Sequence, residues 1–162
     1  MTSGSLLGIP EMTWWYPIIA FILLSIALLT IPRKDLKSLF FESLMWGFVL
    51  SLAFMAAMNA LHFFRYVHQG PFSFLGASSW LALAWSPAIM VFLYFKPPSN
   101  KPLRFWSYLL AFSLLSAVLD AVLHEMGLLR YYRWSPLARF CAAFVWFWAS
   151  AYVHERYFSR QP

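Results

Sequence analysis

Charged residues are scarce in this chain. Only 11% of its 162 residues are Asp, Glu, Lys or Arg, whereas a soluble domain carries about 25%. Hydrophobic residues make up 62% of the chain and aromatic residues 21%. Apolar runs of about 20 residues, long enough to cross a bilayer, recur along the whole length. This composition excludes a soluble globular domain and predicts a multi-pass protein of the cytoplasmic membrane.

Other features are missing as well. The single cysteine, Cys141, excludes an intramolecular disulfide. The chain has no glycine-rich phosphate-binding loop and no Ser-His-Asp arrangement, so we expect a non-enzymatic protein. Its net charge is +6, but the basic residues fall in short loops, where they set orientation and meet lipid phosphates. Because no continuous basic face remains for a nucleic acid, we expect membrane lipids as partners and no nucleic acid.

The apolar runs predict five transmembrane helices in one all-α domain that covers residues 1–162. The expected ranges are 14–31, 41–64, 72–95, 105–129 and 136–153. Short loops between them make each helix antiparallel to its neighbour along the chain. In the third range, Pro87 cannot donate a backbone hydrogen bond and displaces the carbonyl of Leu83. We therefore expect a kink there, with Ser86 or a neighbour bonding to the freed carbonyl.

The distribution of basic residues predicts the orientation. One side of the bundle collects Arg33, Lys34, Lys37, Lys96, Lys101, Arg104, Arg156 and Arg160. The other side collects Arg65, Arg130, Arg133 and Arg139. Because basic loops stay in the cytoplasm, we expect the N-terminus outside and the C-terminus in the cytoplasm.

Ionisable side chains inside the expected helices are the main clue to function, because a charge near a helix centre costs about 2.5–3.5 kcal/mol. Helical spacing places Ser113, Ser116, Asp120 and His124 on one stripe of the fourth helix. There His124 can hydrogen-bond to Asp120. The fifth helix begins near Arg139, a natural countercharge for Asp120.

The second and fourth helices are expected to run parallel, so their polar ends lie at similar depth. We predict an outward-facing polar pocket among the second, fourth and fifth helices. Its expected lining residues are Asn59, His62, Arg65, Asp120, His124 and Arg139. The excess of basic groups suits a small anionic or lipid-like ligand, for which the protein would be a receptor, a carrier or an accessory subunit.

Two other interpretations stay open, and the cofactor stays unknown. His62, His124 and Asp120 match a common ligand set for a divalent first-row metal, and two histidines can hold a haem. Either group would make the protein a membrane enzyme or redox subunit. Alternatively, the polar residues form a network that joins three helices, in a structural subunit of a homodimer or of a larger membrane complex.

Two segments resemble each other in sequence. They are NALHFFRY (59–66) and DAVLHEMGLLRY (120–131). Because both stand at the outer ends of expected helices, the similarity leaves open that a two-helix unit was duplicated.

The segment IPRKDLKSLFFESLMWGF (31–48), with the chain length and the five expected helices, resembles a family of small uncharacterised membrane proteins of Gram-positive bacteria. The resemblance implies a five-helix membrane bundle. Since that family carries no assigned activity, the resemblance implies no functional residues.

Overall fold

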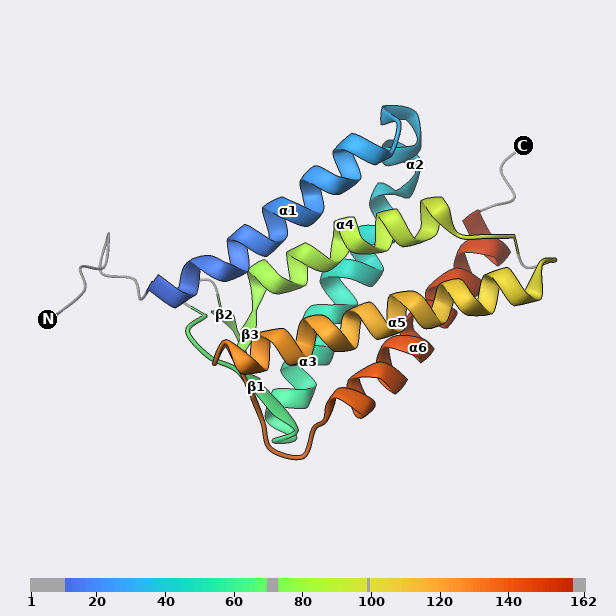
Figure 1. The fold of residues 1–162 in the computed structure, drawn as a ribbon. Coiled ribbons are helices and arrows are strands. Elements are labelled where there is room, and N and C mark those ends of the chain that lie inside the picture. Colours follow the sequence, from blue (N-terminus) through green and yellow to red (C-terminus); the bar gives the residue numbers. More distant parts are fainter. Residues whose placement is uncertain (1–10, 70–72, 99, 159–162) are drawn as a thin grey trace, which may run out of the picture.

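The computed structural model describes residues 11–69, 73–98 and 100–158. They form a mostly helical bundle with two short two-stranded sheets (Figure 1). In chain order the elements are η2 (Glu11–Trp14), α1 (Trp15–Thr30), α2 (Arg33–Ser43), η3 (Leu44–Val49), α3 (Leu50–Ala60), β1 (Phe64–Tyr66), β2 (Ser73–Phe74), β3 (Ala77–Ser78), α4 (Ser79–Phe95), α5 (Pro102–Glu125), β4 (Leu129–Tyr131), α6 (Pro136–Val153) and η4 (His154–Phe158).

Four helices are long and apolar enough to cross a membrane. They comprise residues Met12–Thr30, Arg33–Ala60, Pro102–Glu125 and Pro136–Phe158. This agrees with four of the five expected spans and with a multi-pass membrane protein. The expected all-α fold is right in its helices, but the sequence patterns did not predict the two small sheets.

The second long helix is continuous through α2, η3 and α3, so it begins before the expected residue 41 and ends before residue 64. Its middle turn, η3, is a π-helix. There Gly47 faces the backbone of α4, and a Cβ at this position would overlap the Cα of Ser86. Glycine is therefore required for the close approach of the two helices.

The remaining apolar helix, α4, corresponds to the third expected range and is shorter than expected. Its 17 residues span about 26 Å, less than the roughly 30 Å of a hydrocarbon core. The expected span began at residue 72, but the β2–β3 hairpin occupies 73–78, with positive φ at Leu75 and Gly76. Ser78 then caps the helix, because its side chain accepts a hydrogen bond from the N–H of Leu81.

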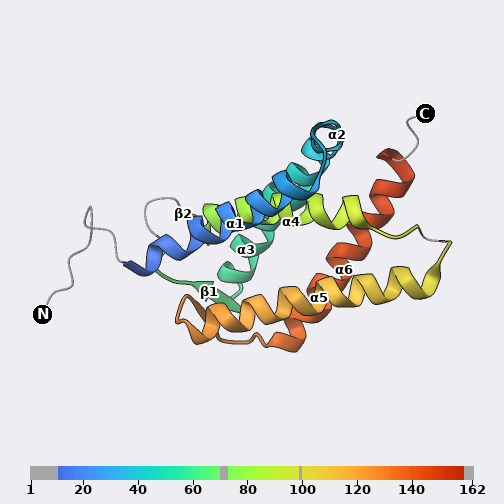
Figure 2. The ribbon, with the colours of Figure 1, turned by 45° about the horizontal axis from the view of Figure 1, so that its top comes forward.

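The central helix of the bundle is α4. On one side α1 packs along its length, on another η3 crosses it, and α5 pairs with α6 (Figures 1 and 2). The core falls into two clusters of buried residues, one around Phe92, Leu109 and Phe147 and the other around Tyr16 and Phe64. Many apolar residues of the outer helices remain exposed, as expected for a surface that faces lipid.

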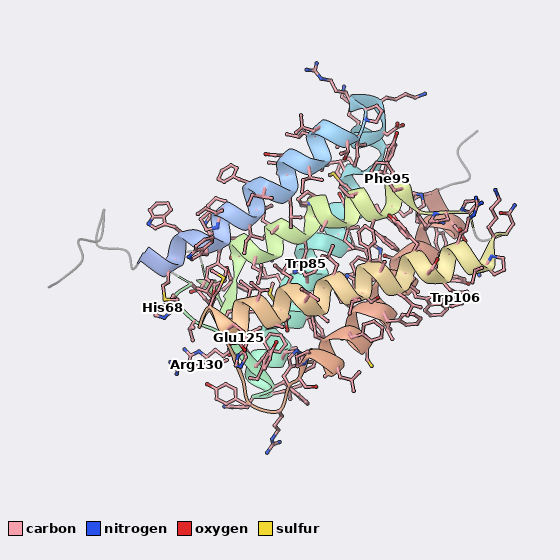
Figure 3. The ribbon with its side chains drawn as sticks, viewed as in Figure 1. His68, Trp85, Phe95, Trp106, Glu125 and Arg130 are labelled. Atoms are coloured by element: carbon pink, nitrogen blue, oxygen red, sulfur yellow. The ribbon has the colours of Figure 1, made fainter. Side chains whose placement is uncertain are left out.

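Strands β1 and β4 pair antiparallel at one end of the bundle, which we call the ribbon end. Helices α3 and α5 both end there, and α1, α4 and α6 begin there. Figure 3 shows His68, Glu125 and Arg130 at the ribbon end, Phe95 and Trp106 at the opposite end, and Trp85 between them. The side of the membrane that each end faces stays a prediction.

Candidate functional site

Asp120 lies at the centre of a buried polar network next to the ribbon. The residue is 4% exposed, and three donors from the ribbon and the segment after it surround its carboxylate. Tyr66 Oη donates to Oδ1 at 3.4 Å, while Tyr131 Oη and Trp134 Nε1 donate to Oδ2 at 3.4 and 3.3 Å. These distances exceed the usual hydrogen-bond lengths of about 2.5–3.2 Å, so each of the three bonds is weak. Together the donors satisfy both oxygens of a carboxylate that is removed from water.

The two tyrosines stay protonated over the ordinary pH range. Burial, and then the charge of Asp120, raise the pKa of Tyr66 well above its usual value. The same two causes raise the pKa of Tyr131. Both hydroxyls therefore remain hydrogen-bond donors to the carboxylate.

Arg139 at the start of α6 supplies the expected countercharge. Its Nε lies 3.8 Å from Asp120 Oδ1 and donates to Ser116 Oγ at 3.1 Å. Its Cζ lies 5.0 Å from the centroid of the Trp85 ring, in cation–π contact. The arginine therefore links α6 to α5 and α4 from a position that is 9% exposed.

The cavity beside Arg139 is too small for an organic ligand. It measures about 30 Å³ and is lined by Ser51, Trp85, Ser116, Arg139 and aromatic and small residues of α3 and α6. A water molecule needs roughly 10–15 Å³ of such space, so the cavity is of the size of one or two waters. Of the expected site residues, Arg139 lines this cavity and Asp120 does not.

Three of the other four expected site residues, Asn59, His62 and His124, lie apart from Asp120. Asn59 Nδ2 donates to the carbonyl of Leu75 in the β2–β3 turn at 3.3 Å. His62 is exposed after the end of α3, with a positive φ of 56°. His124 is also exposed and does not take the expected bond to Asp120. Its Nδ1 lies 2.8 Å from the Leu129 carbonyl oxygen, and its ring stacks on Tyr131.

The chain follows closely similar paths on entering β1 and β4. After α3, the N–H of Phe63 bonds to Met58 O, and after α5 the N–H of Leu128 bonds to Leu123 O. Each of these Schellman-type ends uses a residue with positive φ, His62 in one and Gly127 in the other. In both segments two residues separate this position from the Arg-Tyr pair that follows.

The pairing of the ribbon is symmetric about these two segments. Arg65 stands directly opposite Arg130. On one side of that pair Val67 N donates to Leu128 O, and on the other Tyr132 N donates to Phe63 O. The ribbon is thus approximately two-fold symmetric, and the duplication of a two-helix unit stays a prediction.

The outer face of the ribbon is basic. Arg65 and Arg130 are exposed there, and neither has an ion pair within residues 11–69, 73–98 and 100–158. The exposed basic or imidazole side chains at this end are His62, Arg65, His68, His124, Arg130 and Arg133. Glu125 is an exposed carboxylate of the same end.

A shallow polar pocket of about 290 Å³ opens beside Arg65. It is lined by Arg65, Tyr66, Val67, His68, Gln69, Ser73 and Gly76. Gln69 joins two of the lining segments, because its Nε2 donates to Tyr66 O at 2.6 Å and to Gly76 O at 2.8 Å. Of the expected site residues, Arg65 lines this pocket.

The sequence analysis missed a second polar pair, at the opposite end. Glu42 on α2 is 2% exposed, and its Oε2 lies 2.7 Å from His154 Nδ1 at the start of η4. In a second ion pair at this end, Lys96 Nζ lies 2.5 Å from Glu155 Oε1. Both pairs join segments that are far apart in the chain, so helical spacing could not have predicted them. The signal available in the sequence was the isolated position of Glu42 in an apolar run.

Comparisons with protein-family models, with curated proteins and with solved structures each find no match to this chain. The resemblance to small membrane proteins of Gram-positive bacteria therefore stays a prediction. Within the described part of the chain, no three His, Cys, Asp or Glu side chains are grouped so as to hold a metal ion. In particular, His62 and His124 are exposed whereas Asp120 is buried.

Proposed function

We propose that this membrane protein binds an anionic, phosphate-type group at the ribbon end, between and beside Arg65 and Arg130. The observation that carries the proposal is the register of the ribbon, which places two exposed arginines directly opposite each other. The Cα atoms of such a pair are about 4.5–5.5 Å apart. Like charges at this spacing are destabilising, and one anion held by both guanidinium groups would remove that cost.

The chemistry of the surroundings supports a phosphate-type ligand. Arginine presents a planar set of donors that matches phosphate oxygens in pairs. Arg133 and three exposed histidines add donors at the same end. The pocket beside Arg65 has room for a small head group. The inner residues Asp120 and Arg139 then act as the support that holds the ribbon, and not as ligand contacts.

The same chemistry can come from a dissolved anion or from a lipid. Ends of membrane helices lie at the depth of lipid head groups, and basic side chains there bind lipid phosphates. A small soluble ligand would suit a receptor or carrier, whereas a lipid would suit an accessory subunit that depends on its membrane. The experiment therefore has one arm for each source.

The test uses the full chain in nanodiscs of phosphatidylcholine. One arm measures binding of inorganic phosphate by calorimetric titration. The other arm adds phosphatidylglycerol and measures by native mass spectrometry how much of it the protein retains. We expect Arg65→Gln and Arg130→Gln each to weaken binding about tenfold or more, because a hydrogen bond to a charged group contributes about 1.5–3 kcal/mol.

Arg104→Gln is the matched control, because Arg104 is also exposed but lies at the opposite end, at the start of α5. Phosphate binding that depends on both ribbon arginines would identify a soluble anion. Retention of phosphatidylglycerol that depends on them, without phosphate binding, would identify a lipid. If neither probe binds, or if Arg104→Gln matters as much as the ribbon variants, the proposal is wrong.

A further inference from the structure

Arg65 belongs to two neighbouring features of the ribbon end. It stands opposite Arg130 in the ribbon, and it also lines the polar pocket of about 290 Å³. Its side chain is exposed, because successive residues of a strand point to opposite faces and Tyr66 points inward. An anion that Arg65 holds therefore lies next to the pocket, and a longer ligand can extend from the arginine pair into it.

Two amide side chains hold this pocket in shape. Gln69 Nε2 donates to Tyr66 O and to Gly76 O, which joins the segment after β1 to the β2–β3 turn. Asn59 Nδ2 donates to Leu75 O in the same turn, and a Cβ on Gly76 would overlap this amide group. Bonds within the chain therefore set the shape of the pocket before any ligand binds.

The exposed polar side chains of the pocket suit a second anionic group. Besides Arg65 they are His68 and Ser73, and Figure 3 shows His68 at the same end as Arg130. Within the described part of the chain, the side chains of His68 and Ser73 have no hydrogen-bond or ion-pair partner, and none of the described lining residues is acidic. An imidazole N–H and a hydroxyl can both donate to phosphate oxygens. Because both side chains are exposed, a bound group can reach them.

The charge of the arginine pair favours more than one phosphate group. Arg65 and Arg130 bring two positive charges, whereas a phosphate diester brings a single negative charge. Two linked phosphate groups bring at least two. The guanidinium group of Arg65 has five N–H donors, which is enough to bond to both phosphate groups at once.

We propose that the anion bound at the ribbon end is a diphosphate-type group. One phosphate group lies between Arg65 and Arg130, and the second enters the pocket, where His68 and Ser73 donate to its oxygens. This inference rests on the anion site proposed above and names its ligand class. The same group can come from dissolved pyrophosphate or from the head group of a prenyl diphosphate in the membrane, so the test has one arm for each source.

The test uses the full chain in nanodiscs of phosphatidylcholine. The first arm titrates inorganic pyrophosphate and orthophosphate by calorimetry. The second arm adds equal amounts of farnesyl diphosphate and farnesyl phosphate, and native mass spectrometry measures how much of each the protein retains. We expect the diphosphate to bind about tenfold or more tightly than the monophosphate, because its second phosphate group forms further charge-assisted hydrogen bonds. A preference in the first arm identifies a soluble ligand, and a preference in the second arm alone identifies a lipid.

Two variants separate the pocket from the general attraction of a basic surface. His68→Gly and Ser73→Ala each remove one proposed donor and keep every arginine. Each should reduce the ratio of the two affinities about threefold or more, as expected for one net hydrogen bond. Leu75→Gly is the matched control for His68→Gly. Both residues are exposed and have positive φ, 49° and 55°, which glycine adopts without strain, but Leu75 is not among the lining residues.

Equal binding of monophosphate and diphosphate in both arms, still dependent on Arg65 and Arg130, would overturn this inference and leave the anion site standing. A preference for the diphosphate that survives both His68→Gly and Ser73→Ala would mean that charge alone sets it, and would overturn the inference as well. So would a loss of preference in Leu75→Gly equal to that in His68→Gly. If none of the four phosphate compounds binds, the anion site itself is wrong.

Discussion

Replacing Asp120 by Asn should destabilise the bundle through Arg139. The substitution keeps the shape of the side chain but removes its charge, and Arg139 then stays 9% exposed without a countercharge. Its remaining partners are Ser116 Oγ and the Trp85 ring. Trp134 Nε1 can only donate, so the amide oxygen should turn towards it. The amide N–H₂ group would then face Arg139 Nε, another donor.

The expected loss in the free energy of unfolding lies between two limits. Removing one partner of a buried ion pair costs about 3–5 kcal/mol in soluble proteins. Hydrogen bonds between membrane helices contribute at most about 1.7 kcal/mol. The distance of 3.8 Å between Arg139 Nε and Asp120 Oδ1 indicates a value between these limits, about 2–3 kcal/mol. For a chain of this length that corresponds to a decrease of about 5–10 °C in the midpoint of thermal unfolding.

The assay is thermal unfolding in detergent, followed by circular dichroism, for Asp120→Asn, Arg139→Met and the double variant. Replacing both partners of a buried pair is often neutral, so the double variant should be more stable than the sum of the single effects predicts. Additive effects with no coupling would refute the reasoning. An unchanged midpoint in Asp120→Asn would refute it as well.

Four further predictions use the same unfolding assay. Gly47→Ala should lower stability by about 1–3 kcal/mol or more, because the added methyl group would overlap the backbone of α4. Tyr16→Phe should cost about 1–3 kcal/mol, since the Tyr16 hydroxyl lies 2.5 and 2.8 Å from two carbonyl oxygens at the ribbon end. Glu42→Met should lower stability by about 1 kcal/mol, and adding His154→Phe should restore part of the loss. Burial raises the pKa of Tyr66, so the unfolded chain releases this proton first. The contribution of Tyr66 to the free energy of unfolding should be fully present below about pH 10 and decrease above it. Tyr66→Phe should make that decrease smaller.

The helix ends could be predicted where local chemistry decides them. Pro136 follows Ser135, whose side chain accepts a hydrogen bond from Ala138 N, and the expected fifth range of 136–153 is that of α6. The start of α4 could not be predicted in this way. Phe74 and Leu75 continue the apolar run, but the turn at Leu75 and Gly76 separates them from the helix.

The inner half of the candidate site could be predicted as well. Helical spacing placed Ser116 and Asp120 on one face of α5, and Arg139, near the start of the fifth expected helix, was the expected countercharge. The fate of His124 could not be predicted, because the turn at Gly127 brings the Leu129 carbonyl to it. A helical period also carries no information on a strand that returns over the helix end, so Tyr131 is absent from the expected site residues.

The two-fold symmetry of the ribbon explains why two tyrosines point at one carboxylate. Aligning Arg65 with Arg130 places Tyr66 on Tyr131 and the end of α3 on the end of α5. The same alignment places Met55, which is 2% exposed, on Asp120. A strictly symmetric pair of units would therefore hold two carboxylates or none. Two buried carboxylates beside one Arg139 would leave one without a countercharge, whereas none would leave both tyrosine hydroxyls without this acceptor. A single Asp120 that bonds Tyr66 through Oδ1 and Tyr131 through Oδ2 satisfies both halves. By holding the two tyrosines on the inner face of the ribbon, it also positions the two neighbouring arginines on the outer face, where we propose that they bind the anion.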